Sequence, residues 1–303
     1  MDLKNFQDTF TSIPILIDAH LSKYTFTETG GPADALVFPQ TKEDIKAVVD
    51  YVNKNDIPLT VLGNASNLIV RDGGIRGVVM MLTDLSKIVV ENNKITAASG
   101  ARIIDTSEAA VRASLTGLEF ACGIPGSVGG AVYMNAGAYG GEVIDCFESA
   151  EVVTRDGELK TLSHDEMAFA YRTSALQESG DIVVSTTFAL KEGKTADIRA
   201  LMDDLMQRRI DKQPLEYPSC GSVFKRPEGH YTGQLIQEAG LQGLQWGGAQ
   251  ISKKHAGFIV NIDNATATDY VELIQHIKDV IWKENKVRLE TEVRIIGDEP
   301  IVE

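Results

Sequence analysis

The sequence predicts an α+β fold assembled from compact units, and three observations carry this prediction. Helical and strand-like patterns follow one another as an αβ segment, a mixed α+β segment and a βαβ segment, which suggests three compact units rather than one parallel sheet. The 303 residues suffice for two or three domains with substantial cores. Residues 123–141 hold seven of the chain's 27 glycines among small and apolar side chains, which are not typical of a linker.

The N-terminal segment is expected to form a helix and three short strands. Thr41 is a typical N-cap, and apolar residues recur after it at helical spacing: Ile45, Val48, Val49 and Val52. Pro58 cannot continue a helix, so the helix ends before it. Three short apolar runs typical of strands follow, at 59–62, 68–70 and 78–82. We therefore expect a small αβ unit here.

The central segment is expected to contain two hairpins, a helix and a closing strand. Two pairs of strand-like runs flank turn-forming residues: 87–90 with 94–98, and 149–154 with 158–162. A helix is expected over 103–114, and the β-branched run 181–190 is typical of a strand. Ser163, followed three residues later by Glu166, fits a capping box.

The C-terminal segment is expected to follow a long helix. The apolar residues of that helix share one face: Ile198, Leu201, Met202 and Leu205. After Pro214 the patterns predict a strand at 257–261, a helix at 268–284 and a strand pair around 286–296. The predicted domains are 1–82, 83–195 and 196–303.

Composition excludes several classes of partner. The 29 Lys and Arg against 43 Asp and Glu give a formal charge of −14, which disfavours nucleic acids and anionic membranes. No signal pattern or membrane-spanning apolar run is present, so we expect a cytoplasmic protein. The three cysteines are too few and too scattered for a disulfide framework or a metal site, so free thiols are expected. Nothing in the sequence demands an oligomer, and a monomer is expected.

Two glycine-containing loops suggest a cofactor site. In residues 123–141 the many glycines, which have no side chain, indicate a backbone packed closely against something flat or phosphorylated. In residues 62–67, Leu-Gly-Asn-Ala-Ser-Asn, small residues leave several backbone N–H groups available for one anion. Neither a Walker motif nor a Gly-x-Gly-x-x-Gly turn opening a helix is present, so a Rossmann dinucleotide site is disfavoured. Together the loops suggest a long diphosphate cofactor stretched between two domains.

Six stretches in order resemble one family, the UDP-N-acetylenolpyruvoylglucosamine reductases (UDP-N-acetylmuramate dehydrogenases) of bacterial cell-wall synthesis. They are residues 25–34 (TFTETGGPAD), 62–70 (LGNASNLIV), 123–141, 171–174 (YRTS), 220–225 (CGSVFK) and 289–294 (LETEVR). The resemblance extends from about Tyr24 to Arg294. The short stretch between Arg172 and Ser222 leaves little room for the insertion with a substrate-covering tyrosine found in one branch, so the chain resembles the compact branch.

The resemblance implies a fold and a cofactor. The fold is the FAD-binding fold of the vanillyl-alcohol oxidase or PCMH type, with two α+β subdomains spanning about 30–195 and a C-terminal α/β substrate-binding domain. FAD would be bound non-covalently, with its pyrophosphate on residues 62–67. The implied contacts are Leu62, Gly63, Asn64, Ala65, Ser66, Asn67, Gly123, Ile124, Pro125, Ser127, Gly130, Ala131, Asn135, Ala136, Gly137 and Ile182.

The resemblance also implies a reaction and its catalytic residues. NADPH would reduce FAD, and the reduced flavin would pass hydride to the methylene carbon of UDP-N-acetylglucosamine-enolpyruvate, giving UDP-N-acetylmuramate. Arg172 would clamp the substrate carboxylate, because a guanidinium stays charged and binds a carboxylate bidentately. Glu292 would have to be protonated, since a carboxylate would repel the enolate-like dianion, and Ser222 would donate the proton. Substrate contacts are implied for Lys225, Arg226 and Arg294.

The sequence departs from the family pattern at two positions, and two alternative functions stay open. Ala65 stands where the family's loop usually has glycine, and Arg226 precedes a proline where some members have asparagine. One alternative is another flavin-dependent oxidase or dehydrogenase of the same fold, which would need a base rather than a proton donor over the flavin. The other is a non-catalytic flavin-binding redox protein, which need not keep Ser222, Arg172 and Glu292 together. The sequence gives no preference between NADPH and NADH.

Overall fold

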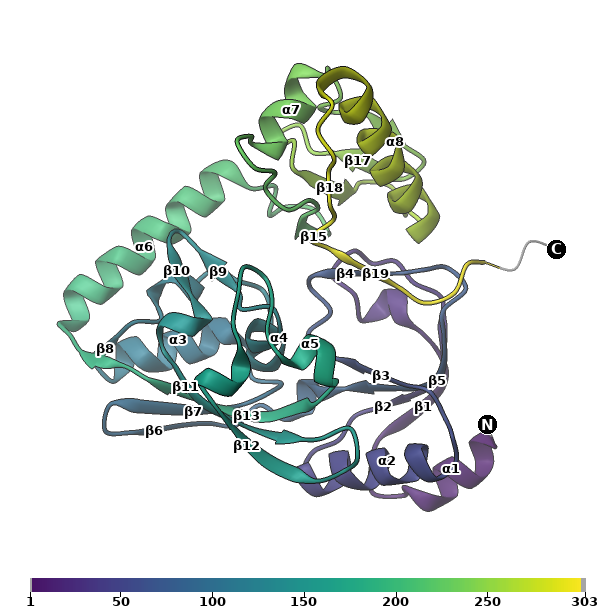
Figure 1. Ribbon diagram of the computed structural model, residues 1–303, viewed down its shortest axis with the longest axis vertical. Helices are drawn as coiled ribbons and strands as arrows, with labels where there is room; N and C mark the ends of the chain where they lie inside the picture. Colours follow the sequence, from purple (N-terminus) through teal and green to yellow (C-terminus); the bar gives the residue numbers. More distant parts are fainter. Residues whose placement is uncertain (1, 301–303) are drawn as a thin grey trace. The chain divides into compact units, whose positions relative to one another are not determined.

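The computed structural model describes residues 2–300, which form two compact units (Figure 1). The first unit comprises residues up to Ile17 together with 35–64 and 77–209, and the second comprises 18–34, 65–76 and the chain from Ile210 onward. Each unit is therefore assembled from segments far apart in the sequence. The finer division into domains 1–82, 83–195 and 196–303 stays a prediction.

The first unit begins with a sheet whose strands are ordered β1-β2-β5-β3 (β1 Ile15–His20, β2 Pro32–Val37, β3 Leu59–Leu62, β5 Ile75–Met81). Strands β1, β2 and β5 run on across the boundary between the units. Two helices, α1 (Leu3–Thr9) and α2 (Lys42–Lys54), contribute to the hydrophobic core of this sheet. The predicted helix start is confirmed, because Thr41 caps α2 in a capping box with Asp44.

A second, five-stranded sheet of the first unit has the order β12-β11-β13-β7-β6, with every neighbouring pair antiparallel. Its strands are β6 (Ile88–Glu91), β7 (Lys94–Ala98), β11 (Phe147–Val153), β12 (Leu159–Ser163) and β13 (Ile182–Ala189). Both predicted hairpins and the closing strand are confirmed. Helices α3 (Ile103–Arg112) and α4 (Val128–Tyr133) share a hydrophobic core with this sheet, and α3 confirms the helix predicted at 103–114.

The remaining elements of the first unit correct two predictions. They are the short strand pairs β8 (Leu115–Thr116) with β14 (Lys191–Glu192) and β9 (Gly137–Ala138) with β10 (Gly141–Glu142), the helix α5 (Leu176–Ser179) and the first part of α6 (Thr195–Lys212). In α6 only Ile198, Met202 and Leu205 are buried, whereas Leu201 is exposed. Half of the capping box expected at Ser163 forms, because the Glu166 carboxylate accepts from the Ser163 N–H at 2.9 Å. The Ser163 hydroxyl donates to the same carboxylate instead of accepting from the backbone, and only one 3-10 turn follows.

The second unit contains a four-stranded antiparallel sheet of order β15-β18-β17-β16 (β15 Ser219–Ser222, β16 Gln245–Trp246, β17 Ala249–Ile251, β18 Phe258–Asn261). Helices α7 (Thr232–Glu238) and α8 (Ala267–Asn285) pack in the core of this unit. The strand pair expected around 286–296 is wrong. Only β19 (Arg294–Ile296) forms there, and it pairs in parallel with β4 (Leu68–Val70), more than 200 residues earlier in the chain.

The start of α8 shows how the second unit ties its distant segments together. The Asp72 carboxylate accepts hydrogen bonds from the backbone N–H groups of Ala267 and Thr268, at 2.9 and 2.8 Å, and from the Thr268 hydroxyl at 2.6 Å. These N–H groups have no partner inside a helix, and a carboxylate also complements the positive end of the helix dipole. Asp72 thereby fixes the loop after β4 to the first turn of α8.

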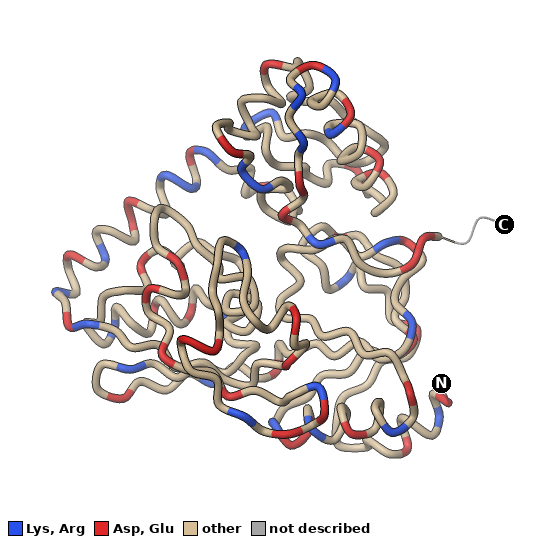
Figure 2. Tube along the Cα trace, in the orientation of Figure 1, with Lys and Arg blue, Asp and Glu red and all other residues tan. Residues whose placement is uncertain are grey.

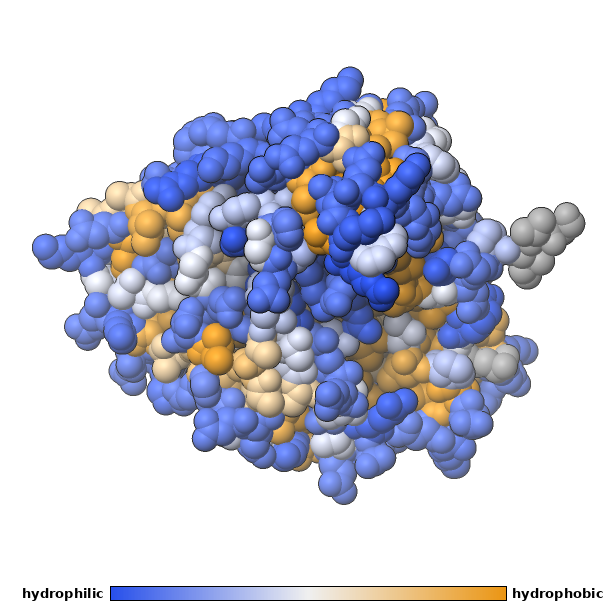
Figure 3. Space-filling model, turned by 45° about the horizontal axis from the view of Figure 1, so that its top comes forward, coloured by the Kyte–Doolittle hydropathy of each residue, from blue (hydrophilic) through white to orange (hydrophobic). Residues whose placement is uncertain are grey.

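The surface agrees with the composition of the chain. Figure 2 shows acidic and basic residues spread along both units, with the acidic excess expected from a net charge of −14. In the face drawn in Figure 3, hydrophilic residues predominate and apolar residues lie in separate groups. Among the described helices, none combines the length and the apolar character required to cross a membrane.

Candidate functional site

The loop between β3 and β4 presents a row of backbone donors. Within residues 2–300, the backbone N–H groups of four successive residues donate no hydrogen bond: Gly63, Asn64, Ala65 and Ser66. Ala65 has a φ of +46°, in the left-handed region where glycine is usual, so the family's glycine is replaced here at a strained position. Successive N–H groups around such a residue form a concave anion site. The loop therefore has the donors that a pyrophosphate requires.

Two direct contacts bring this loop against the glycine-rich run. The Asn64 side-chain amide donates to the Pro125 carbonyl at 2.9 Å. A Cβ at residue 63 would lie 2.3 Å from the Ser127 Oγ, so the backbone can approach this closely only because residue 63 is glycine. Ser127 in turn caps α4 by accepting from the Gly130 N–H at 3.3 Å. Gly63 and Asn64, at the start of the first loop, therefore lie directly against the glycine-rich run within the first unit.

The glycine-rich run 123–141 folds as three short pieces. A loop over 123–127 leads into α4, and the β9–β10 hairpin follows. Partly exposed residues include Gly123, Ile124, Pro125, Gly130, Ala136 and Gly137, whereas Ser127, Ala131 and Asn135 are buried. Ile182 is also buried, at the start of β13 in the core shared with α2. These four buried residues present little surface to a cofactor.

An arginine that the sequence analysis missed lies against this run. The Arg209 side chain of α6 approaches Gly123 so closely that a Cβ there would lie 2.6 Å from the Arg209 Cδ. Burial lowers the pKa of the guanidinium, with the neighbouring Tyr139 and Cys122 opposing this shift. Across residues 2–300, no acidic side chain pairs with Arg209. Arg209 follows Met202 by seven residues and Leu205 by four, so helical spacing places it on the apolar face of α6. An arginine on that face is the sequence signal that could have identified it.

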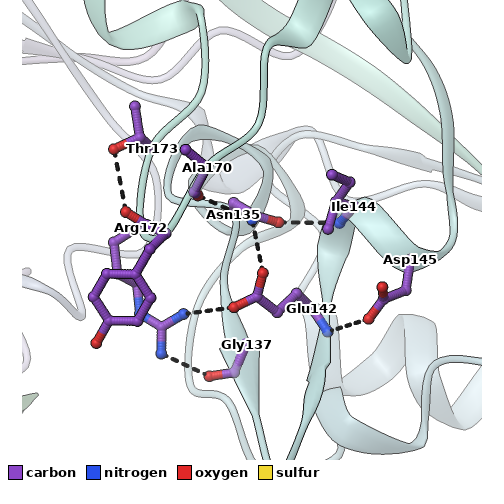
Figure 4. A network of polar contacts seen from close by, with 9 residues as sticks. Asn135, Gly137, Glu142, Ile144, Asp145, Ala170, Arg172 and Thr173 are labelled. Atoms are coloured by element: carbon purple, nitrogen blue, oxygen red, sulfur yellow. Dashed lines mark hydrogen bonds and ion pairs between the residues drawn. The ribbon is translucent and has the colours of Figure 1, made fainter. Parts of the chain in front are cut away.

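Arg172 is held in a polar network around Asn135 and Glu142 (Figure 4). Its Nη2 donates to the Gly137 carbonyl at 3.0 Å, and its Nη1 lies 3.7 Å from the Glu142 Oε1. The Asn135 amide is fully engaged by the protein, because it donates to Glu142 Oε2 and to the Ala170 carbonyl, and accepts from the Ile144 N–H. Asn135 therefore organises the arginine's surroundings.

In the second unit, a β-bulge presents Ser222. Cys220 and Ser222 are two residues apart and would share one face of a regular strand. Instead Cys220 is buried and Ser222 is exposed, because the pairing of β15 with β18 shifts between Ser219 and Ser222, where Gly221 has a φ of +78°. A glycine with positive φ is typical of bulges, which re-aim side chains. The Cys-Gly-Ser order thus turns the serine hydroxyl outward.

The segment that carries Glu292 lies beside this bulge, also within the second unit. The Glu292 N–H donates to the Val223 carbonyl at 2.8 Å, and the Lys225 N–H donates to the Glu290 carbonyl at 2.9 Å. Asn67 joins the same segment, since its carbonyl accepts from the Arg294 N–H at 3.2 Å. The structure therefore brings together the motifs of Ser222 and Glu292, which are 70 residues apart in the sequence.

The predicted substrate residues lie in or next to this cluster. The Lys225 Nζ is 3.3 Å from the Glu290 carboxylate. Arg226 is exposed, its guanidinium stacks 4.0 Å from the centre of the Tyr231 ring, and Arg294 is exposed in β19. Arg172 belongs to the first unit, whereas Ser222 and Glu292 belong to the second.

The three cysteines are buried thiols rather than reactive groups. All are free, and burial raises the pKa of Cys146 and of Cys220 to about 12, and also that of Cys122. A thiol with a raised pKa is a poor nucleophile and a poor metal ligand. The described part of the chain contains no cluster of His, Cys, Asp and Glu able to hold a metal ion.

Two family models match separate stretches of the chain. Residues 33–163 match the model of an FAD binding domain, and residues 213–296 match the model of the C-terminal domain of UDP-N-acetylenolpyruvoylglucosamine reductase. The first match contains both glycine loops and the second contains Ser222, Glu292 and the bulge. The solved structure of Physcomitrella patens BBE-like 1 aligns with a TM-score of 0.50 at 17% identity, over 63% of this chain and 45% of its own, which shows the fold alone.

Whole-length relatives share one name. Proteins called UDP-N-acetylenolpyruvoylglucosamine reductase from Enterococcus faecalis and Levilactobacillus brevis are each 60% identical to this chain, over 99% of it and over 100% and 99% of their own lengths. The crystal structure of the same reductase from Thermus caldophilus aligns with a TM-score of 0.79 at 36% identity, covering 93% of this chain and 98% of that one. The predicted α+β FAD-binding fold with its C-terminal domain is thereby confirmed, and the chain belongs to the UDP-N-acetylenolpyruvoylglucosamine reductase family.

Proposed function

We propose that this protein reduces UDP-N-acetylglucosamine-enolpyruvate to UDP-N-acetylmuramate with NADPH and bound FAD, in peptidoglycan precursor synthesis. The observation that carries the proposal is the exposed Ser222 hydroxyl beside the Glu292 segment. A reductase of a carbon–carbon double bond needs a proton donor at this place, whereas an oxidase of the same fold needs a base. Serine is no general base by itself, so the arrangement favours reduction.

The chain has the groups that FAD requires. The N–H groups of residues 63–66 would bind the pyrophosphate, and the backbone at Gly123, Gly130 and Gly137 would approach the rest of the molecule. Bound FAD would supply the hydride transfer, from NADPH to the enolpyruvyl methylene carbon. No histidine lies in either loop, which fits non-covalent binding.

Six residues would bind the substrate or act on it. Arg172 would hold its carboxylate, and Glu292, when protonated, would donate a hydrogen bond to the negative charge that develops beside it. Ser222 would give its proton to the second carbon of the enolpyruvyl group, since an enolate-like carbanion is a far stronger base than an alkoxide. Lys225 would lower the cost of the transient Ser222 alkoxide, and Arg226 and Arg294 would bind further substrate charge.

Arg209 is expected to favour the reduced state of the bound flavin, because reduction adds negative charge and Arg209 is a half-buried cation without an acidic partner among the described residues. Replacing Arg209 by leucine should lower the flavin reduction potential by roughly 30–60 mV, which corresponds to about 1–3 kcal/mol for two electrons. A dye-equilibrated spectroscopic titration measures this potential. The control is Arg208→Leu, since Arg208 pairs with Asp204 at 2.8 Å on the exposed side of α6. Equal potentials in both variants would refute the role of Arg209.

Anaerobic spectroscopy of the purified protein tests the function itself. NADPH should bleach the flavin absorption, and only subsequent UDP-N-acetylglucosamine-enolpyruvate should restore it. A band that NADPH bleaches but the sugar nucleotide cannot restore would leave the flavin fold intact and exclude the substrate. A colourless protein that takes up no added FAD would contradict the assignment of the two loops.

The domain boundaries and the cellular setting follow from this function. We propose that residues 1–82 and 83–195 bind FAD and that residues 196–303 bind the sugar nucleotide. NADPH and nucleotide sugars are cytoplasmic metabolites, which supports a cytoplasmic location, and no residue of the proposed site requires a second copy of the chain.

A further inference from the structure

Arg172 occupies a two-residue turn whose backbone is fixed from several sides. Ala170 and Thr173 exchange two backbone hydrogen bonds of 3.0 Å across the turn. Arg172 itself has a φ of +55°, and its carbonyl accepts from the Gln177 side chain at 2.9 Å. A positive φ at the second central residue of a turn usually calls for glycine, so an arginine is kept there only where its surroundings over-determine the conformation. The position of the Arg172 backbone, from which the side chain extends, is therefore fixed.

The guanidinium is fixed as well, at the β9–β10 hairpin. It donates to the Gly137 carbonyl, lies 4.9 Å from the centre of the Tyr171 ring and faces the Glu142 carboxylate (Figure 4). Only 18% of the Arg172 side chain is exposed. Charges in such a place are screened less by solvent than at an open surface, so the Glu142 charge acts on the guanidinium at considerable strength.

Glu142 is itself held in place by Asn135. The Asn135 amide donates to Glu142 Oε2 at 3.0 Å, and the same amide group donates to the Ala170 carbonyl, at the start of the turn that carries Arg172. Asn135 is only 1% exposed. The Glu142 backbone N–H is also fixed, because it donates to Asp145 at 2.8 Å. One buried amide thus sets the carboxylate and the arginine's turn relative to each other.

The contact between Glu142 and Arg172 is longer than a closed salt bridge. Elsewhere in the first unit, Arg199 and Glu108 form a bidentate pair with two contacts of 2.7 Å. The Glu142 Oε1 lies 3.7 Å from the Arg172 Nη1, beyond hydrogen-bond length, so Glu142 acts on the guanidinium through its charge and not through a hydrogen bond. A Cβ at Gly137 would lie 2.6 Å from the Glu142 Cγ and 3.3 Å from the Arg172 Nη1, so the arrangement depends on glycine there.

We propose that Glu142 is a positioning residue, which holds the Arg172 guanidinium in the orientation that receives the substrate carboxylate, a role that rests on the proposed function. Its negative charge has two opposed effects. It keeps Arg172 aimed at the charge that develops in the transition state, and it repels the anionic substrate in the ground state. Loss of the charge should therefore slow the chemical step without weakening substrate binding.

The test is rapid mixing of anaerobically reduced enzyme with UDP-N-acetylglucosamine-enolpyruvate at a series of concentrations. For Glu142→Gln, the saturating rate of flavin reoxidation should fall about 10–100-fold, while the half-saturating concentration stays equal or falls. Glu142→Asp should recover part of the rate, because the carboxylate is kept. FAD content and reduction by NADPH should match the wild type. The control is Glu148→Gln, because the Glu148 carboxylate pairs with Lys94 at 2.7 Å and both side chains are partly exposed.

Each other outcome overturns the inference. An unchanged saturating rate in Glu142→Gln would show that Arg172 needs no such partner. A raised half-saturating concentration together with lost FAD would assign Glu142 a merely structural role. If the wild-type enzyme were not reoxidised by the sugar nucleotide, the proposed function would fail and the inference with it, whereas a normal wild type beside an unaffected variant would remove the inference alone.

Discussion

Replacement of Ser222 by alanine is expected to abolish most of the reoxidation of the flavin by UDP-N-acetylglucosamine-enolpyruvate while leaving its reduction by NADPH intact. The bulge at Gly221 turns this hydroxyl outward beside the Glu292 segment, and no other hydroxyl of β15 is presented in this way. Removing a positioned proton donor typically costs about 10²–10⁴-fold in rate. Reduction by NADPH involves no proton from Ser222, so the rate of flavin reduction should change by less than about twofold in stopped-flow measurements.

Two further variants separate proton donation from disturbance of the strand. Ser219→Ala removes a hydroxyl from the same strand before the bulge and should leave both half-reactions unchanged. Gly221→Ala places a Cβ at a residue whose φ of +78° favours glycine. The backbone should therefore shift and misdirect Ser222, which slows reoxidation although the hydroxyl is present. Equal slowing of both half-reactions in Ser222→Ala would refute the role of proton donor.

Replacement of Asn135 by alanine is expected to destabilise the protein by about 3 kcal/mol. The amide makes three hydrogen bonds, to Glu142, Ala170 and Ile144, and the residue is buried. Alanine would leave the Ile144 N–H and the Ala170 carbonyl without their partner, and it tolerates a φ of +40° less well than asparagine does. Denaturant unfolding followed by circular dichroism measures the loss.

The matched control is Asn53→Ala. The Asn53 amide makes one exposed hydrogen bond, to the Arg155 carbonyl at 2.7 Å, so its loss should cost less than about 1 kcal/mol. Asn135→Ala should also weaken the response to UDP-N-acetylglucosamine-enolpyruvate, because it releases both Glu142 and the turn that carries Arg172. Stability within 1 kcal/mol of the wild type (on the order of one hydrogen bond) would mean that the network around Asn135 contributes little to the fold.

Local patterns were sufficient where neighbouring residues decide the structure. The N-cap of α2 and the two hairpins of the five-stranded sheet depend on residues within a few positions of each other, and each was predicted. The predicted strand pair near the C-terminus failed for the opposite reason. A strand pair was expected around 286–296, but β19 pairs with β4, and no local pattern encodes a partner so distant in the chain.

The sequence by itself determined the family, the flavin fold and the identity of the proposed site residues, because the glycine loops and the Cys-Gly-Ser segment are contiguous motifs with fixed spacing. Only the tertiary structure decided how these residues are presented. It showed the bulge that exposes Ser222, the full engagement of Asn135, the unpaired Arg209 beside Gly123 and the long contact between Glu142 and Arg172 among the described residues. The physical reason is that the exposure of a side chain, its hydrogen-bond partners and its distance from other charges depend on contacts between segments far apart in the sequence. Local sequence patterns do not encode those contacts.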